Sequence, residues 1–294
     1  MQTMILFFIM VIGYSFHSLF TRLYAANYAG RDAAMATPIF SVIHGGAVAL
    51  ISFIAGGMIF APSWQTVLLG ILNAGILILF NIATIEVGNR GPYSFMMVCS
   101  MFGGILVPVV VGPLFMGEPF GVLQGVAAIL MMVALVLMNG QKISLKGASQ
   151  GYYFWCLVLF LSNGVFGVIQ NLQVKVMGGA QRSEMLTILY GCSALGVLLP
   201  MLVRGQGKKF LQGMHVGKKA GIHLTVACFA TALAVNLLLF ILNNMPSSML
   251  YTMDNGAVLV LSILYALVLF KEKPTKAQVM GMILAVCSIV IINL

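Results

Sequence analysis

The chain has 294 residues, of which 61% are hydrophobic and only 7% are charged, and its mean hydropathy is +1.06. Soluble domains are about 45–50% apolar and about 25% charged, so this composition excludes an ordinary soluble protein and predicts an all-α integral membrane protein. A net charge of +9 would suggest a nucleic-acid partner for a soluble protein. In a membrane protein, lysine and arginine instead set the orientation in the bilayer, so we expect no nucleic-acid partner.

Ten apolar segments follow one another along the chain, separated by charges, Pro/Gly clusters and short polar runs. A helix that crosses the hydrocarbon layer needs about 20 apolar residues, so the pattern predicts ten transmembrane helices. Their approximate ranges are 3–22, 34–60, 65–87, 92–114, 119–139, 151–173, 185–204, 220–241, 246–270 and 275–293. No basic residue precedes the first segment, which favours a first span over a cleaved signal sequence.

The ten segments divide into two sets of five, in residues 1–140 and 151–294, with a connection at 141–150. A shift of 154 positions aligns identical residues at helix starts and connections, as expected for an internal duplication. The aligned pairs are Asn89/Asn243, Pro92/Pro246, Ser94/Ser248, Glu118/Glu272, Gln124/Gln278 and Asn139/Asn293. Five is an odd number, so two tandem copies lie in opposite orientations. Such inverted repeats are typical of carriers that expose a midplane site to each side in turn.

Two segments, GEPFGVLQGVAAILMMVALVLMN and KEKPTKAQVMGMILAVCSIVIIN, close the two sets of five. Both resemble the end of an EamA-type repeat, in which a Glu between the fourth and fifth helices is followed by a Gln and a last helix that contains Gly. The whole chain resembles a ten-span member of the drug/metabolite transporter superfamily. This resemblance implies a carrier of small metabolites, often an exporter, with a cavity between its two halves.

Basic residues are distributed unevenly between alternate sides of the predicted spans. Thirteen of the fifteen Lys and Arg residues fall on one side, and only Lys175 and Arg182 fall on the other. Basic connections stay in the cytoplasm, so both termini are predicted to lie outside the cell. We expect the plasma membrane, which is the inner membrane of a prokaryote. The basic stretch 204–219 is interpreted as a cytoplasmic loop near anionic headgroups, so membrane lipids are expected partners.

Only six residues are acidic, and most have structural explanations. Glu86 lies four residues before Arg90, which is the spacing of an ion pair on one helix face. Glu118 and Glu272 occupy equivalent connections of the two repeats, where a carboxylate meets the positive end of a helix dipole. We interpret these two as structural, with a role as gate residues as the alternative.

Asp254 differs from the other acids because it lies inside the ninth segment. It is eight residues beyond Pro246, about 12 Å along a helix that rises 1.5 Å per residue. No Lys or Arg lies within four residues of it. An Asp at the centre of a span costs about 2.5–3.5 kcal/mol, so such residues face cavities and usually carry function. The alternative is a protonated Asp254 that hydrogen-bonds to a neighbouring helix.

Other polar residues recur at similar depths on several predicted helices, which favours a shared aqueous cavity. Any one of them taken alone is explained as well by interhelical hydrogen bonding, worth about 0.6 kcal/mol on average. The predicted substrate-binding residues are Asp254, Tyr251, Asn255, Ser248, Tyr14, His17, His44 and Asn163. Asp254 and His17 are also the predicted coupling residues.

The sequence predicts a secondary active transporter that exports a small cationic or zwitterionic metabolite, such as an amino acid or amine, by proton-coupled alternating access. No Walker motif is visible in the sequence, so an ion or substrate gradient would supply the energy. The alternatives are an exchanger of an anionic metabolite or sugar conjugate, and a channel-like membrane protein. A membrane enzyme would need a reactive group such as HExxH, and we predict no catalytic residues.

We expect no cofactor and no metal site. The five cysteines form no CxxC pair, and each lies in an apolar run where cysteine behaves as a small hydrophobe. The expected partner is a small-molecule substrate, bound by a monomer or homodimer.

Overall fold

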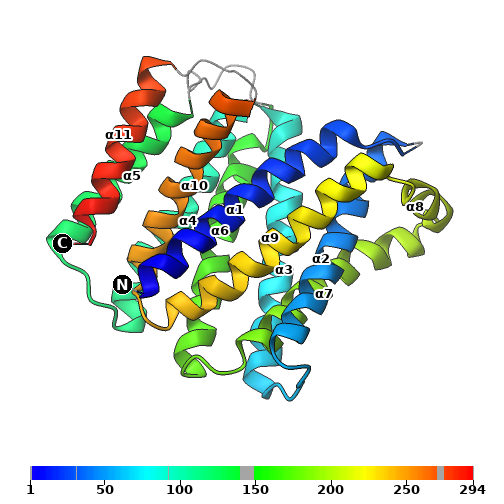
Figure 1. The fold of residues 1–294 in the computed structure, drawn as a ribbon, viewed down its shortest axis with the longest axis horizontal. Helices are drawn as coiled ribbons and strands as arrows, with labels where there is room; N and C mark the ends of the chain where they lie inside the picture. The colour runs from blue at the N-terminus through cyan, green and yellow to red at the C-terminus, as the bar shows by residue number, and fades with distance from the viewer. Residues whose placement is uncertain (1, 31, 92, 140–148, 270–274, 294) are drawn as a thin grey trace. The chain divides into compact units, whose positions relative to one another are not determined.

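The computed structural model of the protein describes residues 2–30, 32–91, 93–139, 149–269 and 275–293. These residues form helices joined by turns and loops, and none of them lies in a β-strand. Glu272 and residues 141–148 of the predicted connection lie outside the described residues. Figure 1 shows the helices in chain order.

The described helices are close to the predicted apolar segments. In chain order they are α1 (Gln2–Asn27), the 3₁₀ helix η1 (Ala33–Met35), α2 (Ala36–Ala55), α3 (Trp64–Arg90), α4 (Tyr93–Met116), α5 (Val122–Met138), α6 (Tyr152–Val176), α7 (Arg182–Val203), α8 (Gly207–Gly213), α9 (Lys218–Leu242), α10 (Ser247–Leu269) and α11 (Lys276–Ile291). The short helix α8 was not predicted, because it lies in the basic stretch that we interpreted as a loop. Its Phe210 is buried, and Lys208 and Lys209 are exposed.

Eight of the described helices are long and apolar enough to cross a membrane. They are α1, α2, α3, α4, α6, α7, α9 and α10. Helix α5 has 17 residues and α11 has 16, fewer than the about 20 that a membrane span needs. The described residues therefore confirm an all-helical fold with eight helices that could span a membrane, and the exact count of ten stays a prediction.

Helices α5 and α11 begin with the same hydrogen bond. The backbone N–H of Gly121 donates to Gln124 Oε1 at 2.9 Å, and that of Thr275 donates to Gln278 Oε1 at 2.8 Å. At α11, the Gln278 N–H also donates to Thr275 Oγ1, which completes a capping box. The 154-residue shift aligns these two glutamines, and both accept a hydrogen bond at the N-terminus of their helix.

The chain forms two compact units, and each draws helices from both halves of the sequence. Unit 1 contains residues 1–78 and 177–240, and unit 2 contains residues 79–176 and 241–294. Unit 1 thus holds α1, α2, the first part of α3, α7, α8 and most of α9. Unit 2 holds the rest of α3, α4, α5, α6, α10 and α11.

In unit 1, α2 and α7 pack side by side in opposite directions. A Cβ atom on Gly45 would lie 3.1 Å from the Cβ atom of Ala194. Four residues further along α2, the Ala49 carbonyl oxygen accepts a hydrogen bond from Thr187 Oγ1 at 3.3 Å. The partner number falls as the α2 number rises, so the two helices are antiparallel.

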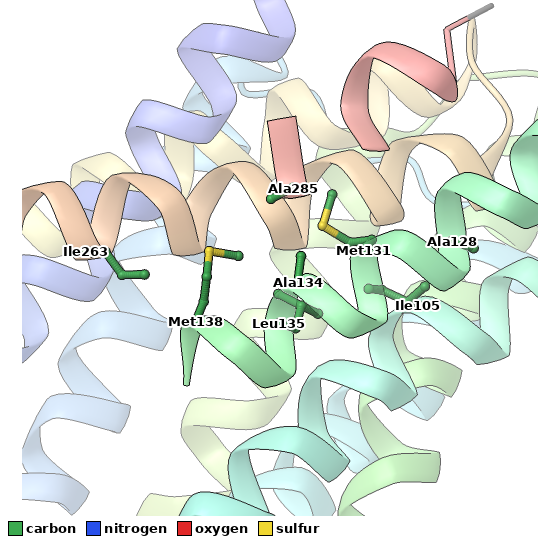
Figure 2. Packing of buried hydrophobic residues seen from close by; sticks show 8 residues of the cluster. All are labelled: Ile105, Ala128, Met131, Ala134, Leu135, Met138, Ile263 and Ala285. Carbon is green, nitrogen blue, oxygen red and sulfur yellow. The ribbon is translucent and has the colours of Figure 1, made fainter. Parts of the chain in front are cut away.

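In unit 2, α5 and α11 form a second antiparallel pair, which Figure 1 shows side by side. Ser288 Oγ donates to the Ala127 carbonyl oxygen at 2.7 Å, and Gln278 Nε2 donates to the Met138 carbonyl oxygen at 3.4 Å. The main apolar core of this unit lies around the pair, with one side chain from α4 and one from α10 (Figure 2). Its buried residues are Ile105, Ala128, Met131, Ala134, Leu135, Met138, Ile263 and Ala285.

Helices α4 and α10 form a third antiparallel pair, and it carries the region of interest for function. A Cβ on Gly104 would lie 3.4 Å from the Asn255 amide, and a Cβ on Gly112 would lie 3.0 Å from Ser247 Oγ. Two α4 glycines thus allow α10 to approach closely. Helix α6 also contacts both α4 and α10.

Candidate functional site

Polar side chains lie on two contacting helices of unit 2, α6 and α10, and α4 contacts both of these helices. We call this set the α6–α10 polar group: Asn163 and Gln170 on α6, and Ser248, Tyr251, Asp254 and Asn255 on α10. Five of these six residues were predicted as substrate-binding, and Gln170 was not. The sequence signal for Gln170 is its spacing of seven from Asn163, which places both on one helix face.

Tyr251 links α10 to α6. Its hydroxyl lies 3.1 Å from the Gly167 carbonyl oxygen and 3.2 Å from Gln170 Oε1, and it has one proton to share between these acceptors. A Cβ on Gly167 would lie 2.9 Å from the Tyr251 ring, so the ring packs where only glycine leaves room. Tyr251 is therefore held in place by α6.

Asn163 and Asn255 lie on opposite helices beside Gly104. A Cβ on Gly104 would lie 2.9 Å from Asn163 Nδ2 and 3.4 Å from Asn255 Nδ2. Asn163 Nδ2 donates to the Ser100 carbonyl oxygen at 2.7 Å, and Asn255 Nδ2 donates to the Tyr251 carbonyl oxygen at 2.8 Å. Each amide is oriented by a backbone carbonyl, and both amides lie beside the same residue of α4, Gly104.

Asp254 is the eighth residue of α10, about 11 Å from the start of that helix at 1.5 Å per residue. Its Oδ1 atom is buried and has no hydrogen-bond partner among the described residues. The side chain as a whole is partly exposed. This arrangement differs from the alternative that we considered, a carboxyl group hydrogen-bonded to a neighbouring helix.

Further buried polar atoms of α6 and α10 have no partner in the described part of the chain. They are Gln170 Nε2, Asn171 Oδ1 and Ser248 Oγ. Buried polar groups in native proteins are nearly always hydrogen-bonded, so several unpaired atoms on two facing helices need an explanation. A bound polar ligand or water that supplies the missing partners is the simplest one.

Glu118 lies at the start of α10 and not at the start of the next helix in sequence, α5. Its Oε2 atom accepts from Ser247 N and Ser247 Oγ, both at 2.8 Å, and from Ser248 N at 3.4 Å. Its Oε1 atom accepts from Asn171 Nδ2 at 2.7 Å. The sequence correctly predicted a carboxylate at a helix N-terminus but did not identify the helix.

The charge of Glu118 is balanced within unit 2. Lys175 Nζ, in the last turn of α6, lies 3.9 Å from Glu118 Oε1. The carboxylate side chain is only 1% exposed, whereas that of Lys175 is 44% exposed. Glu118 is thus a buried carboxylate surrounded by donors, which fits a structural anchor better than a cation site.

Two predicted histidines meet in unit 1. Thr231 Oγ1, on α9, lies 2.7 Å from His17 Nδ1 on α1 and 2.9 Å from His44 Nε2 on α2. The imidazole ring centroids are 5.1 Å apart. Glycines allow these helices to approach closely, since a Cβ on Gly13 would lie 3.0 Å from the Ala230 carbonyl oxygen. Thr231 was not predicted, because a threonine in an apolar helix is common.

The predicted site residues fall in both units. Tyr14, His17 and His44 belong to unit 1, and Asn163, Ser248, Tyr251, Asp254 and Asn255 belong to unit 2. The structure brings His17 and His44 together through Thr231, and Asn163 and Asn255 together beside Gly104, while a single site made of both sets stays a prediction. Tyr14 lies on α1, where its carbonyl oxygen accepts a hydrogen bond from Ser18 Oγ at 3.1 Å.

The described residues contain no cluster of three or more His, Cys, Asp or Glu side chains placed to hold a metal ion.

The i, i+4 ion pair predicted on α3 is confirmed, with Arg90 Nε 2.9 Å from Glu86 Oε2. Its two side chains are about one-third exposed.

Comparison with solved structures agrees with this helical arrangement. A solved structure described only as "Crystal structure of protein" covers 99% of this chain and 96% of its own, with a TM-score of 0.70 and 16% sequence identity. At that identity the likeness shows the fold alone. No curated protein matches the chain.

Comparison with protein families identifies the second half of the sequence. Residues 151–294 match the profile of the EamA-like transporter family. These residues include α6 and α10, which carry the α6–α10 polar group, as well as the connection that holds Glu272. Residues 151–294 thus belong to the EamA-like transporter family, within the drug/metabolite transporter superfamily, and the protein is a multi-pass membrane transporter.

Proposed function

We propose that the protein is a secondary active transporter that exports a small cationic or zwitterionic metabolite, such as an amino acid or an amine. The observation that carries this proposal is the carboxylate of Asp254. It lies inside a membrane-spanning helix, and its buried Oδ1 atom has no hydrogen-bond partner among the described residues. Ionisable groups at such positions are costly, and they mark substrate and proton pathways in transporters.

The chemistry of the α6–α10 polar group supports a substrate with hydrogen-bond donors. A carboxylate accepts hydrogen bonds and forms its strongest ones with charged donors such as ammonium. Asp254 would pair with the amine, while Asn255 and Tyr251 orient the rest of the molecule. Ser248 and Gln170 have unpaired polar atoms that would bind a hydroxyl or carboxyl group of the same substrate.

Proton coupling is the proposed source of energy. Asp254 would bind either the cationic substrate or a proton, because one carboxylate does not neutralise both at once. The substrate would leave Asp254 in exchange for a proton when the site opens to the outside. The proton would leave when the site opens to the cytoplasm, which couples export to proton entry. His17 is proposed as a second coupling residue in unit 1.

Alternating access is proposed to rest on two inverted five-helix repeats, residues 1–140 and 151–294, with ten spans in all. Three helix pairs support this arrangement, because α2/α7, α4/α10 and α5/α11 join equivalent positions of the two repeats and are all antiparallel. The shared cap at Gln124 and Gln278 supports it as well. An experimental structure in which the two sets of five helices do not superpose would contradict the duplication.

Purified protein in proteoliposomes tests the function. A thermal-shift screen against amines, amino acids, nucleosides and sugar phosphates first selects compounds that stabilise the folded state. The account predicts that an amine or amino acid raises the melting temperature, and that an imposed pH gradient drives its accumulation against a concentration gradient. Stabilisation by sugar phosphates alone would favour the anion exchanger, and equilibration without accumulation would favour a channel.

We further propose that the protein lies in the plasma membrane with its basic connections in the cytoplasm and both termini outside. Lys208, Lys209, Lys218 and Lys219 around α8 are exposed, as expected for contact with anionic headgroups. An alkaline phosphatase fusion at the C-terminus should be active in a bacterial host. An inactive phosphatase together with a bright green fluorescent protein fusion at the same end would reverse the orientation.

A further inference from the structure

The Thr231 hydroxyl has three hydrogen-bond neighbours, and they allow two arrangements of its proton. It lies within reach of His17 Nδ1, His44 Nε2 and the Ala227 carbonyl oxygen, the last at 2.9 Å. A hydroxyl has one proton to donate and two lone pairs with which to accept. While it donates to Ala227, both imidazole nitrogens must carry protons and donate to it.

A second arrangement follows when the hydroxyl turns away from Ala227. It then donates to one imidazole nitrogen and accepts from the other, which forms a continuous N–H···O–H···N chain. The distances of 2.7 Å to His17 and 2.9 Å to His44 are both ordinary hydrogen-bond lengths. No backbone movement is needed to change from one arrangement to the other.

We propose that Thr231 passes a proton between His17 and His44, so that the two histidines share one mobile proton. Transfer starts from protonated His17 and a neutral His44 whose Nε2 holds a lone pair. The N–H bond at His17 Nδ1 breaks as an O–H bond forms at Thr231, and the original O–H bond breaks as an N–H bond forms at His44 Nε2. The hydroxyl is restored, and the positive charge has moved from α1 to α2.

An aromatic ring, that of Phe40, lies beside both histidines. The Phe40 ring is stacked on His44, with centroids 5.0 Å apart and an interplanar angle of 13°, and it lies 6.2 Å from His17. An aromatic face attracts a cation within about 6 Å, so Phe40 favours an imidazolium at His44. Among titratable side chains, Tyr24 packs against Phe40 and Tyr190 against His44, and Cys228 belongs to the same apolar cluster as Phe40.

This inference deepens the proposed proton coupling and rests on it for its role in transport. It assigns Thr231 as a positioning and relay residue, and it joins His17 and His44 into one functional unit. The relay itself is a property of unit 1, because all three side chains and Ala227 belong to that unit.

Nitrogen-15 NMR of the full chain in lipid nanodiscs tests the relay. Labelled histidine reports the protonation of each ring, and the variants His17→Gln and His44→Gln assign the two signals. Strongly coupled groups lose their protons in two steps that belong to the pair, so a shared proton predicts that both rings report the same two midpoints. In Thr231→Val, which keeps the shape but loses the hydroxyl, each ring should titrate with its own midpoint. Thr231→Ser should restore the two common midpoints.

Separate midpoints in the wild-type protein, or a Thr231→Val titration identical to that of the wild type, would overturn the relay. If Thr231→Val does not fold, the wild-type and Thr231→Ser titrations still decide the question. The readout does not require a substrate. Common midpoints for His17 and His44 in a protein that fails to transport would count against the proposed function and would not contradict the relay.

Discussion

The carboxylate of Glu118 accepts a hydrogen bond from the backbone N–H of Ser247 at 2.8 Å, across 129 residues of sequence. The same carboxylate binds the Ser247 hydroxyl and the Asn171 amide, so it holds the first turn of α10 against α6. Helix α10 carries Tyr251 and Asp254 on the turns that follow. Glu118 therefore positions the helix on which the proposed substrate site is built.

Glu118→Ala is expected to lower the free energy of unfolding by about 3 kcal/mol. The variant leaves buried donors of Ser247 and Asn171 without a charged acceptor, and each unpaired donor costs about 1–3 kcal/mol. Thermal unfolding in detergent measures the change as a lower melting temperature.

The matched control is Glu86→Ala on α3. Its carboxylate pairs with Arg90, but both side chains are about one-third exposed. An exposed i, i+4 ion pair contributes about 0.3–0.5 kcal/mol, so this variant should melt close to the wild type. Equal losses in the two variants would show that Glu118 is not the anchor that its contacts indicate.

Tyr251→Phe should lower the free energy of unfolding by about 1 kcal/mol, because it removes the hydroxyl shared by Gly167 and Gln170. It should also weaken substrate binding, since the freed Gln170 side chain loses its fixed orientation. Isothermal titration with the stabilising compound from the thermal-shift screen measures the second effect. Tyr153→Phe is the control, because Tyr153 lies on α6 and is 56% exposed. A similar loss of affinity in both variants would contradict a role for the Tyr251 hydroxyl.

Gly104→Ala should impair transport more than it impairs stability. The added methyl group would lie 2.9 Å from Asn163 Nδ2 and 3.4 Å from Asn255, so at least one amide must move out of the α6–α10 polar group. Uptake into proteoliposomes should fall about tenfold, because displacements near 1 Å at a binding group are costly. Gly46→Ala on α2 has no atom within 4 Å of the added methyl group and should transport normally. Full transport by Gly104→Ala would exclude Asn163 and Asn255 from the site.

The sequence predicted the long helices well because apolar runs and Pro/Gly breaks are local signals. Pro246 illustrates this, since α10 begins at the next residue. Helix α8 was missed because its seven residues are too few to show an apolar period among four nearby lysines. Local sequence patterns also could not predict that helices from the two halves of the sequence pack together. Units 1 and 2 each combine segments that are distant in the sequence.

The candidate site was predicted in part. Asp254 stood out because a carboxylate inside an apolar segment is rare, and the helical period correctly placed Tyr251 on its face. Thr231 and the α10 contact of Glu118 could not be found in the same way. Both depend on which helices pack together, and a single sequence without aligned relatives carries no signal for such contacts.

Asp254→Asn provides the most direct test of the central claim. The carboxylate Oδ1 has no hydrogen bond to lose among the described residues, so the variant should unfold within about 0.5 kcal/mol of the wild type. The account predicts that proteoliposomes containing this variant lose accumulation of the stabilising amine or amino acid under an imposed pH gradient, while the wild type accumulates it. Accumulation by Asp254→Asn at the wild-type rate would show that the carboxylate neither binds the substrate nor couples its transport to protons.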